Sequence, residues 1–210
     1  MILSTAILKG TELDIEPEYA EGLDALIREC HEHLPSVDEE LIRRAFRVSY
    51  WAHRNDRRAT GELYISHPLA VARIFVRQIG LDDTSVAAAL LHDVVEDTEF
   101  SLDLIRDTFG DILAGIIDGL TKISGAFESR AVVQAENVRK LMLSMASDIR
   151  VILVKFADWL HNMQTLGSLP KHKQFKIASE TLELFAPLAH RFGFNALKSE
   201  FEDLCLAVLN

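Results

Sequence analysis

Apolar residues recur at helical spacing along almost the whole chain. Leu41, Ile42, Ala45 and Phe46, for example, would share one face of a helix. No run shows the period-two alternation of a half-buried strand, and no hairpin dipeptide such as Asn-Gly is present. The pattern therefore predicts an all-α fold, with helices at about 37–49, 67–79, 82–95, 101–107, 112–120, 131–146, 148–166, 173–189 and 196–208.

Local signals predict where several of these helices begin and end. Ser36 and Glu39 have the spacing of a capping box, and Gly80 is expected to end the helix that begins at His67. Pro187 should kink or end the helix in which it lies, because proline lacks the amide hydrogen that a helix interior needs. The helix at 82–95 is apolar on all sides, which is typical of a buried helix.

The remaining segments are expected to be loops or a loosely held terminus. Residues 54–65 and 121–130 contain Gly61 and Gly125 and are interpreted as loops. Residues 1–18 should form a loosely packed lead-in to one domain that spans residues 1–210. No internal repeat or low-complexity stretch suggests a second unit.

Composition narrows the class of partner. The chain has 210 residues, of which 49% are hydrophobic, so it can bury a sizeable core. Its formal charge is -10, from 32 acidic and 22 basic residues. Such a chain repels a polyphosphate backbone, so we expect no nucleic-acid polymer as its main partner. A small anionic substrate stays compatible with this charge if a metal and local cations offset it.

Other features predict a cytoplasmic protein without a membrane segment. The N-terminus lacks the basic region and cleavage pattern of a signal peptide. Apolar runs such as 151–154 are far too short to span a bilayer. The two cysteines, Cys30 and Cys205, form no CxxC pair, so neither a disulfide framework nor a zinc-thiolate site is expected.

The adjacent residues His92 and Asp93 carry the strongest chemical signal. Neighbouring side chains on a helix lie about 100° apart, but both could reach an ion held at a junction between helices. His67 and Asp158, on other predicted helices, would complete a ligand set of nitrogen and oxygen. Such a set suits Mn²⁺, Fe²⁺ or Zn²⁺ better than Ca²⁺. The sequence therefore predicts one divalent metal ion and metal-assisted hydrolysis.

Glu96 and Asp97 follow Asp93 by three and four residues, a spacing that returns them to one face if the helix continues. They could orient the attacking water, accept its proton, or bind the ion through water. Taken singly, each of these residues would more often be a packing residue or a solvated charge. His53 and His161 are interpreted as structural residues or as partners of the ligands.

Several motifs agree in order and spacing with a known family. They lie at residues 64–68, 91–98, 118–122, 134–140, 155–166 and 186–191, and the similarity runs from about residue 39 to residue 206. The chain resembles the RelA/SpoT homologue family and, more specifically, its HD-type (p)ppGpp hydrolase domain. This resemblance implies an HD-superfamily helical bundle with a metal site between its helices.

The resemblance also implies a reaction and a set of residues. The reaction is hydrolysis of the 3′-pyrophosphate of ppGpp and pppGpp, which releases GDP or GTP and pyrophosphate and ends the stringent response. Mn²⁺ is the usual metal of the family. The family's positions fall on the metal ligands His67, His92, Asp93 and Asp158, the catalytic acidic pair Glu96 and Asp97, and the nucleotide contacts Arg58, Asn162 and Thr165.

Two positions depart from the family pattern. The loop that commonly reads Arg-Lys-Ser-Gly-Glu-Pro has Ala59 in place of the lysine, which removes one cation and so bears on nucleotide affinity or base selectivity. The residue after Asp158 is usually arginine and here is Trp159. That change removes an ion pair or adds a packing or stacking surface.

Two further alternatives concern the setting of the domain. Many family members carry a synthetase domain and regulatory domains after this region, so we expect the N-terminal domain of a longer enzyme; the alternative is a stand-alone hydrolase. The chain contains no P-loop. Two other functions compete with the alarmone hydrolase: a non-catalytic nucleotide-binding regulatory domain, or an HD phosphohydrolase of another nucleotide.

Overall fold

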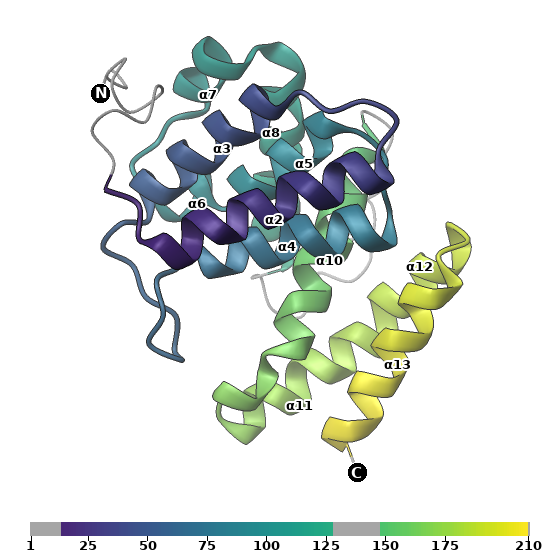
Figure 1. Ribbon diagram of the computed structural model, residues 1–210. Coiled ribbons are helices and arrows are strands. Elements are labelled where there is room, and N and C mark those ends of the chain that lie inside the picture. The colour runs from purple at the N-terminus through teal and green to yellow at the C-terminus, as the bar shows by residue number, and fades with distance from the viewer. Residues whose placement is uncertain (1–13, 128–147, 210) are drawn as a thin grey trace.

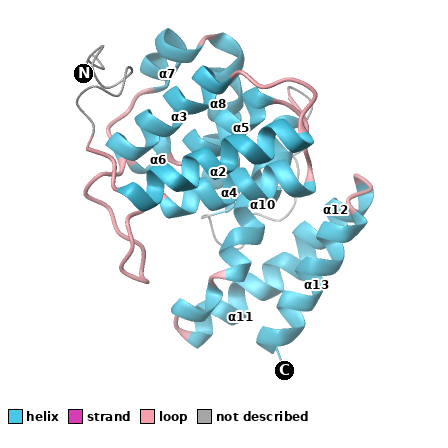
Figure 2. Cartoon of the chain, in the orientation of Figure 1, coloured by secondary structure: helices cyan, strands magenta, loops and turns pink. Residues whose placement is uncertain are grey.

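The computed structural model describes residues 14–127 and 148–209, and within these ranges it has no β-strand, only an isolated bridge between Arg57 and Leu63. The all-α prediction is therefore confirmed, and Figure 2 shows helices joined by loops. The described elements are α2 (Pro17–His33), α3 (Glu39–Ala52), α4 (Ser66–Gln78), α5 (Asp83–Leu91), α6 (Val94–Asp97), α7 (Leu102–Phe109), α8 (Asp111–Phe127), α10 (Arg150–Gln164), η1 (Leu166–Ser168), α11 (Lys171–Glu180), η2 (Thr181–Phe185), α12 (Ala186–Arg191) and α13 (Asn195–Leu209).

The helices α2 to α8 form the larger of two groups, and α5 lies at its centre. Residues 85–91 are all buried, as expected for a helix that is apolar on every side. Helices α3, α4, α8 and α10 pack around it (Figure 1). Its C-terminal end is thereby fixed in the core, where the chain continues into the adjacent residues His92 and Asp93.

Side-chain caps set the first residues of α3 and α5. The Asp82 carboxylate accepts a hydrogen bond from the Ser85 amide at 2.7 Å, and the Asp38 carboxylate accepts one from the Leu41 amide at 3.0 Å. Each bond satisfies an amide that the first helical turn leaves without a partner, a contribution of about 1 kcal/mol. The prediction of Ser36 as the cap was wrong: α3 begins at Glu39, and Asp38 caps it.

Helix α10 joins this larger group to the C-terminal helices, which are α11, α12 and α13. It packs against α4, α5 and α8 and also against α13 (Figure 1). Phe156, Phe185 and Phe201 are fully buried between α10 and the C-terminal helices. The helix predicted at 173–189 is interrupted by the π-helical turn η2, and Pro187 lies in the first turn of α12, where proline is tolerated.

The structure differs from the predicted helix limits at several places. Helix α2 was not predicted; it begins at Pro17, inside the expected lead-in, and buries Tyr19 and Leu23. Residues 121–127, predicted as loop, continue α8, whose buried residue Ile123 ties this turn to the core. The helix predicted at 131–146 and the first 13 residues of the lead-in lie outside the described residues.

No helix in the described ranges combines the length and the apolar character that crossing a bilayer requires. Both cysteines, Cys30 and Cys205, are buried and form no disulfide bond.

Helix α10 contacts both the larger group of helices and the C-terminal helices (Figure 1). The packing of both groups therefore determines where the residues of α10 lie.

Gly119 lets α8 approach α10 closely, and this contact generates a prediction. A Cβ atom at position 119 would lie 2.7 Å from Cγ2 of Val151, so a side chain there forces the helices apart. We expect Gly119→Ala to destabilise the fold: overpacking costs about 1–3 kcal/mol, more than the ~1 kcal/mol that alanine adds to a helix. Chemical denaturation measures the change in unfolding free energy.

Gly115 provides a matched control in the same helix. It is exposed, and a Cβ atom there would meet nothing within 4 Å. Gly115→Ala should therefore stabilise the protein by about 0.5–1 kcal/mol through helix propensity alone. If both variants raised stability equally, the close approach of α8 to α10 would play no part in the fold.

Candidate metal centre

A break in the helical backbone brings His92 and Asp93 to the same side. Helix α5 ends at Leu91 and α6 begins at Val94, so both residues lie in the turn between the two helices. Nε2 of His92 is 3.0 Å from Oδ2 of Asp93. The prediction of one helix through residue 95 was wrong, whereas the predicted helix junction is present. A straight helix would have separated the two side chains by about 100°.

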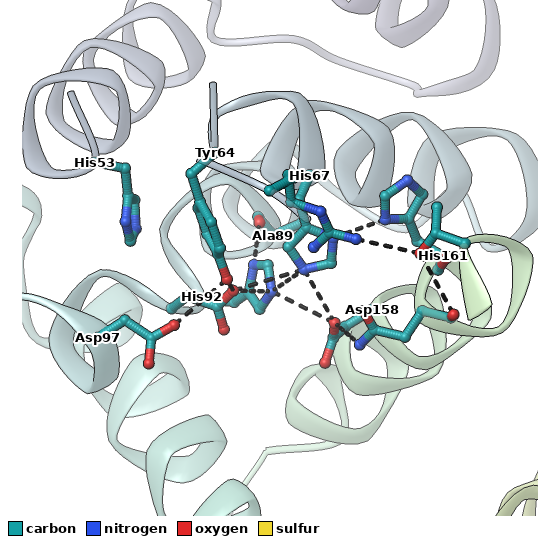
Figure 3. Close-up of polar contacts among 12 residues, drawn as sticks. His53, Tyr64, His67, Ala89, His92, Asp97, Asp158 and His161 are labelled. Carbon is teal, nitrogen blue, oxygen red and sulfur yellow. Dashed lines mark hydrogen bonds and ion pairs between the residues drawn. The ribbon is translucent and has the colours of Figure 1, made fainter. Parts of the chain in front are cut away.

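Two further side chains complete the cluster. His67 comes from the first turn of α4 and Asp158 from the middle of α10. Nε2 of His67 lies 3.2 Å from Oδ1 of Asp158 and 3.2 Å from Nε2 of His92 (Figure 3). The side chains are 2% exposed for both histidines, 4% for Asp158 and 14% for Asp93. The structure thus brings together all four residues that the sequence singles out as ligands.

The donor set fits a divalent metal. Nδ1 of His92 is 2.8 Å from the carbonyl oxygen of Ala89, an acceptor only, so Nδ1 carries the proton and Nε2 turns its lone pair toward the cluster. Nδ1 of His67 is likewise occupied, at 2.7 Å from Nδ1 of His161. Such partners on the outer nitrogen orient imidazole ligands in metal sites. The ligand atoms of His67, His92 and Asp93 lie within 4.8 Å of one another, close enough to share one ion.

The negative charges of the two clustered carboxylates also favour a bound cation. Burial opposes ionisation of Asp93 and Asp158, but the His92 imidazole, for Asp93, and the Lys155 ammonium, for Asp158, outweigh it and hold both pKa values well below their usual range. Burial disfavours a charged His92, yet the two carboxylates raise its pKa to about 10. Without a metal, Nε2 of His92 would therefore also carry a proton, in the position that a metal ion would take in the loaded site.

Lys155 and Asn162 hold the Asp158 carboxylate from the same helix. The Lys155 ammonium donates to Oδ2 of Asp158 at 2.7 Å, and the Asn162 amide donates to Oδ1 at 2.8 Å. Lys155 is buried, which lowers its pKa, but the Asp158 charge outweighs burial and raises it. The role of Lys155 was missed, although its i,i+3 spacing to Asp158 was visible. Asn162, predicted as a nucleotide contact, here contacts the candidate ligand.

Arg58 and Thr165 meet beside the cluster, 107 residues apart in sequence. Nη2 of Arg58 donates to Oγ1 of Thr165 at 3.2 Å, and that hydroxyl donates to the carbonyl of His161 at 2.9 Å. Burial, then the positive charges of His67 and Arg58, lower the pKa of His161 to about 3, so its ring is neutral. His161 contacts the candidate ligand His67, and its role as a partner of a ligand stays a prediction.

Glu96 and Asp97 lie on the short helix α6, one turn beyond Asp93. The amide of Asp97 donates to the carbonyl of Asp93 at 2.8 Å, which keeps the two residues on one side. Burial, then the negative charge of Asp93, raise the pKa of Asp97, a condition that suits a group exchanging protons with water. Glu96 is exposed, and its charge contributes to the raised pKa of Lys155.

Tyr64 is a second residue that the sequence interpretation missed. Its hydroxyl donates to Oδ2 of Asp93 at 2.6 Å and lies 3.4 Å from Oδ2 of Asp97 (Figure 3). Burial and then the charge of Asp93 raise the pKa of Tyr64, so the phenol keeps its proton and acts as a donor. Only its place three residues before His67, at the start of α4, could have suggested the contact.

The two departures from the family pattern have different structural consequences. Ala59 is exposed in the loop before α4. Trp159 stacks on Phe185 with ring centroids 4.1 Å apart and donates its Nε1 hydrogen to Oγ1 of Thr181 at 2.8 Å. Of the two alternatives for this position, the structure shows the packing and stacking surface.

Comparisons with known proteins identify the family and the fold. A family model described as HD domain matches residues 45–195. A solved structure of a metazoan ortholog of SpoT, described as hydrolysing ppGpp, has a similar fold, with a TM-score of 0.65 and 23% identity. The similarity covers 80% of this chain and 96% of that one. The HD-type helical bundle that the sequence predicts is thus confirmed.

Curated relatives come from several bacteria. The chain is 44% identical over 194 residues to a GTP pyrophosphokinase of Streptomyces coelicolor, covering 91% of the chain and 23% of that protein. It is 48% identical over 160 residues to the guanosine-3′,5′-bis(diphosphate) 3′-pyrophosphohydrolase of Haemophilus influenzae, covering 76% and 24%. The chain spans about a quarter of the length of these relatives. It therefore belongs to the HD domain family, and its resemblance to the RelA/SpoT homologues is confirmed.

Proposed function

We propose that this chain is a metal-dependent hydrolase domain that removes the 3′-pyrophosphate of ppGpp and pppGpp. The products are pyrophosphate and GDP or GTP, and in the cell the reaction would end the stringent response. The observation that carries the proposal is the meeting of His67, His92, Asp93 and Asp158 at one buried point. The name of the Haemophilus influenzae relative, guanosine-3′,5′-bis(diphosphate) 3′-pyrophosphohydrolase, supports the choice of substrate.

One Mn²⁺ ion is the proposed cofactor, held by the two histidines and two aspartates of the cluster. Mixed imidazole and carboxylate ligands suit Mn²⁺, and the resemblance to the RelA/SpoT homologues favours it over Fe²⁺ and Zn²⁺. Such an ion polarises a phosphoryl oxygen and lowers the pKa of bound water. The protein's part is to hold the ligands in place, through Lys155 and Asn162 on Asp158 and through Ala89 on His92.

Asp97 and Glu96 are the proposed catalytic pair. Asp97 lies one turn from Asp93 and has a raised pKa, so its carboxylate can accept a proton from the attacking water. Glu96, on the same short helix and exposed like Asp97, would help to orient that water. A positioned general base typically contributes about 10²–10⁴ in rate.

Arg58, Asn162 and Thr165 are the proposed nucleotide contacts. The guanidinium plane of Arg58 can stack on a purine and donate hydrogen bonds in the same site. Its hydrogen bond to Thr165 holds the two groups together, so a base bound by both would leave the 3′-phosphates free to face the proposed metal. Because Ala59 adds no cation, Arg58 supplies a large share of the attraction at this end.

The wider protein is also part of the proposal. Residues 1–210 would form one hydrolase domain of a longer cytoplasmic enzyme, joined to synthetase and regulatory domains. The lengths of the curated relatives support this arrangement, since the chain matches 23% of the Streptomyces coelicolor protein and 24% of the Haemophilus influenzae protein.

The assay that tests the function is release of pyrophosphate from ppGpp by the purified chain with Mn²⁺. We expect turnover with ppGpp and pppGpp, none after chelation, and recovery when Mn²⁺ is restored. Binding without turnover would favour a regulatory domain. Turnover of dGTP or other nucleotides in preference to ppGpp would favour a different HD phosphohydrolase.

Removing Asp158 should empty the metal site. Asp158→Ala leaves an incomplete ligand set and a buried Lys155 without its counter-charge, so metal content and turnover should both fall. Metal per chain is measured by elemental analysis after dialysis. The exposed Asp103→Ala serves as the control and should keep both. Full metal content and activity in Asp158→Ala would show that Asp158 is not a ligand.

Glu96→Gln and Asp97→Asn should retain the metal and most of the nucleotide affinity while kcat falls by about 10²–10⁴ for the residue that acts as base. The expected order follows from the pKa values: that of Asp97 is raised, which suits a proton acceptor, so its variant should lose more. Steady-state kinetics at saturating Mn²⁺ give the comparison. A variant that loses metal but regains full kcat at high Mn²⁺ would identify that residue as support for a ligand.

Arg58→Ala should raise KM for ppGpp strongly and leave Mn²⁺ binding unchanged, because Arg58 contacts Thr165 and none of the four ligands. Ala59→Lys should lower KM by restoring the cation that the family commonly has. Arg106→Ala, which removes an equal charge on the remote helix α7, controls for long-range attraction. Wild-type KM in both loop variants would show that the loop does not hold the nucleotide.

A further inference from the structure

The Tyr64 hydroxyl binds the metal-facing oxygen of a candidate ligand. It donates to Oδ2 of Asp93 at 2.6 Å, and this same oxygen lies 3.0 Å from Nε2 of His92 and 3.6 Å from Nε2 of His67. The hydroxyl is also 3.4 Å from Oδ2 of Asp97 (Figure 3). One phenol therefore stands between a ligand and the proposed base.

The position of Tyr64 is fixed through its backbone. Its amide donates to the carbonyl of Asp56 at 3.0 Å, and its carbonyl accepts from the amide of His67 at 2.9 Å. The second bond ties it directly to a ligand at the start of α4. The backbone from which the phenol extends is therefore held in place relative to His67.

The ring of Tyr64 is held between two imidazoles. The His53 ring stacks on one side, with centroids 4.4 Å apart and an interplanar angle of 30°. The His67 ring meets it edge-on, at 5.8 Å and 71°. Figure 3 shows His53 beside Tyr64 and apart from the cluster of ligands. Contacts of this kind restrict the rotation that would carry the hydroxyl away from Asp93.

The buried position of His53 leaves one of its ring nitrogens without a hydrogen bond among the described residues. It is 2% exposed, and its Nδ1 pairs with Oδ2 of Asp56 at 3.1 Å. Its Nε2 has no hydrogen-bond partner among the described residues, an unfavourable state for a buried polar atom. What the buried ring provides is therefore its flat face against Tyr64.

We infer that Tyr64, clamped by His53, is a positioning residue that fixes the Asp93 carboxylate for metal binding and sets its separation from Asp97. A phenol donor suits this task because it adds no positive charge that would compete with the cation. The inference rests on the proposed metal, and it extends the site by two residues that touch neither the ion nor the nucleotide in the proposed arrangement.

The test is the affinity for Mn²⁺, measured by isothermal titration calorimetry without any nucleotide. Tyr64→Phe keeps the ring stack and removes only the hydroxyl, so the Kd for Mn²⁺ should rise by about 10–100-fold, as for other partners of metal ligands. At saturating Mn²⁺, kcat should stay below the wild-type value while KM is unchanged. Tyr50→Phe removes another buried hydroxyl far from the cluster and should leave the Kd unaltered.

Variants of His53 test the clamp separately. His53→Ala removes the stacking face and should raise the Kd for Mn²⁺, and His53→Phe, which restores an aromatic face, should recover part of the loss. Wild-type Kd and kcat in Tyr64→Phe would overturn the inference, as would an unchanged Kd in His53→Ala if Tyr64→Phe did not fold. If the wild-type chain binds Mn²⁺ but does not hydrolyse ppGpp, the proposed function fails, while the Kd comparison still decides the role of Tyr64.

Discussion

Two carboxylates, Asp93 and Asp158, are held with little exposure around the same point, and their mutual repulsion is the constraint on which the site depends. Burial of a charge is costly unless a countercharge or hydrogen bonds compensate it. Lys155 supplies one permanent positive charge, and the two imidazoles face the remaining oxygens. A divalent cation at this point would satisfy both carboxylates at once, which is why the geometry indicates a metal more strongly than any single residue does.

The fold produces this convergence by ending and crossing helices at the right places. Helix α5 is buried on all sides and stops at Leu91, so the next two residues turn inward from a fixed position in the core. Helix α4 presents His67 from its first turn, and α10 brings Asp158 from the segment it shares with the C-terminal helices. Gly119 permits the close contact of α8 with α10 that keeps the latter in place.

The sequence alone predicted those features of the fold and site that depend on residues close together in the chain. The all-α fold was predicted from the helical spacing of apolar residues. The candidate ligands were predicted from the adjacent His92 and Asp93 and from a histidine at a helix start, and the structure brings the four predicted ligands together. Helix α2 was missed although Tyr19, Leu23 and Leu26 have helical spacing. Residues 121–127 were misread as loop because Gly125 weighs against a helix until packing of Ile123 is known.

The partners of the ligands were harder to foresee because they depend on distances in space. Tyr64 and Asp93 are 29 residues apart, and nothing in the pattern of either segment shows that the phenol reaches the carboxylate. Asn162 illustrates the opposite case: its position on α10 was noted, but its amide donates to Asp158, four residues earlier, in this structure. Helical spacing alone allows that bond without selecting it over a nucleotide contact.

The central claim is that one divalent ion binds among these four side chains, and anomalous diffraction tests it most directly. Crystals grown with Mn²⁺ and measured above the manganese absorption edge should show one strong peak, bonded to Nε2 of both His67 and His92 and to an oxygen of both Asp93 and Asp158. A peak held instead by Glu96 and Asp97, or no peak among the four residues at saturating Mn²⁺, would contradict the account.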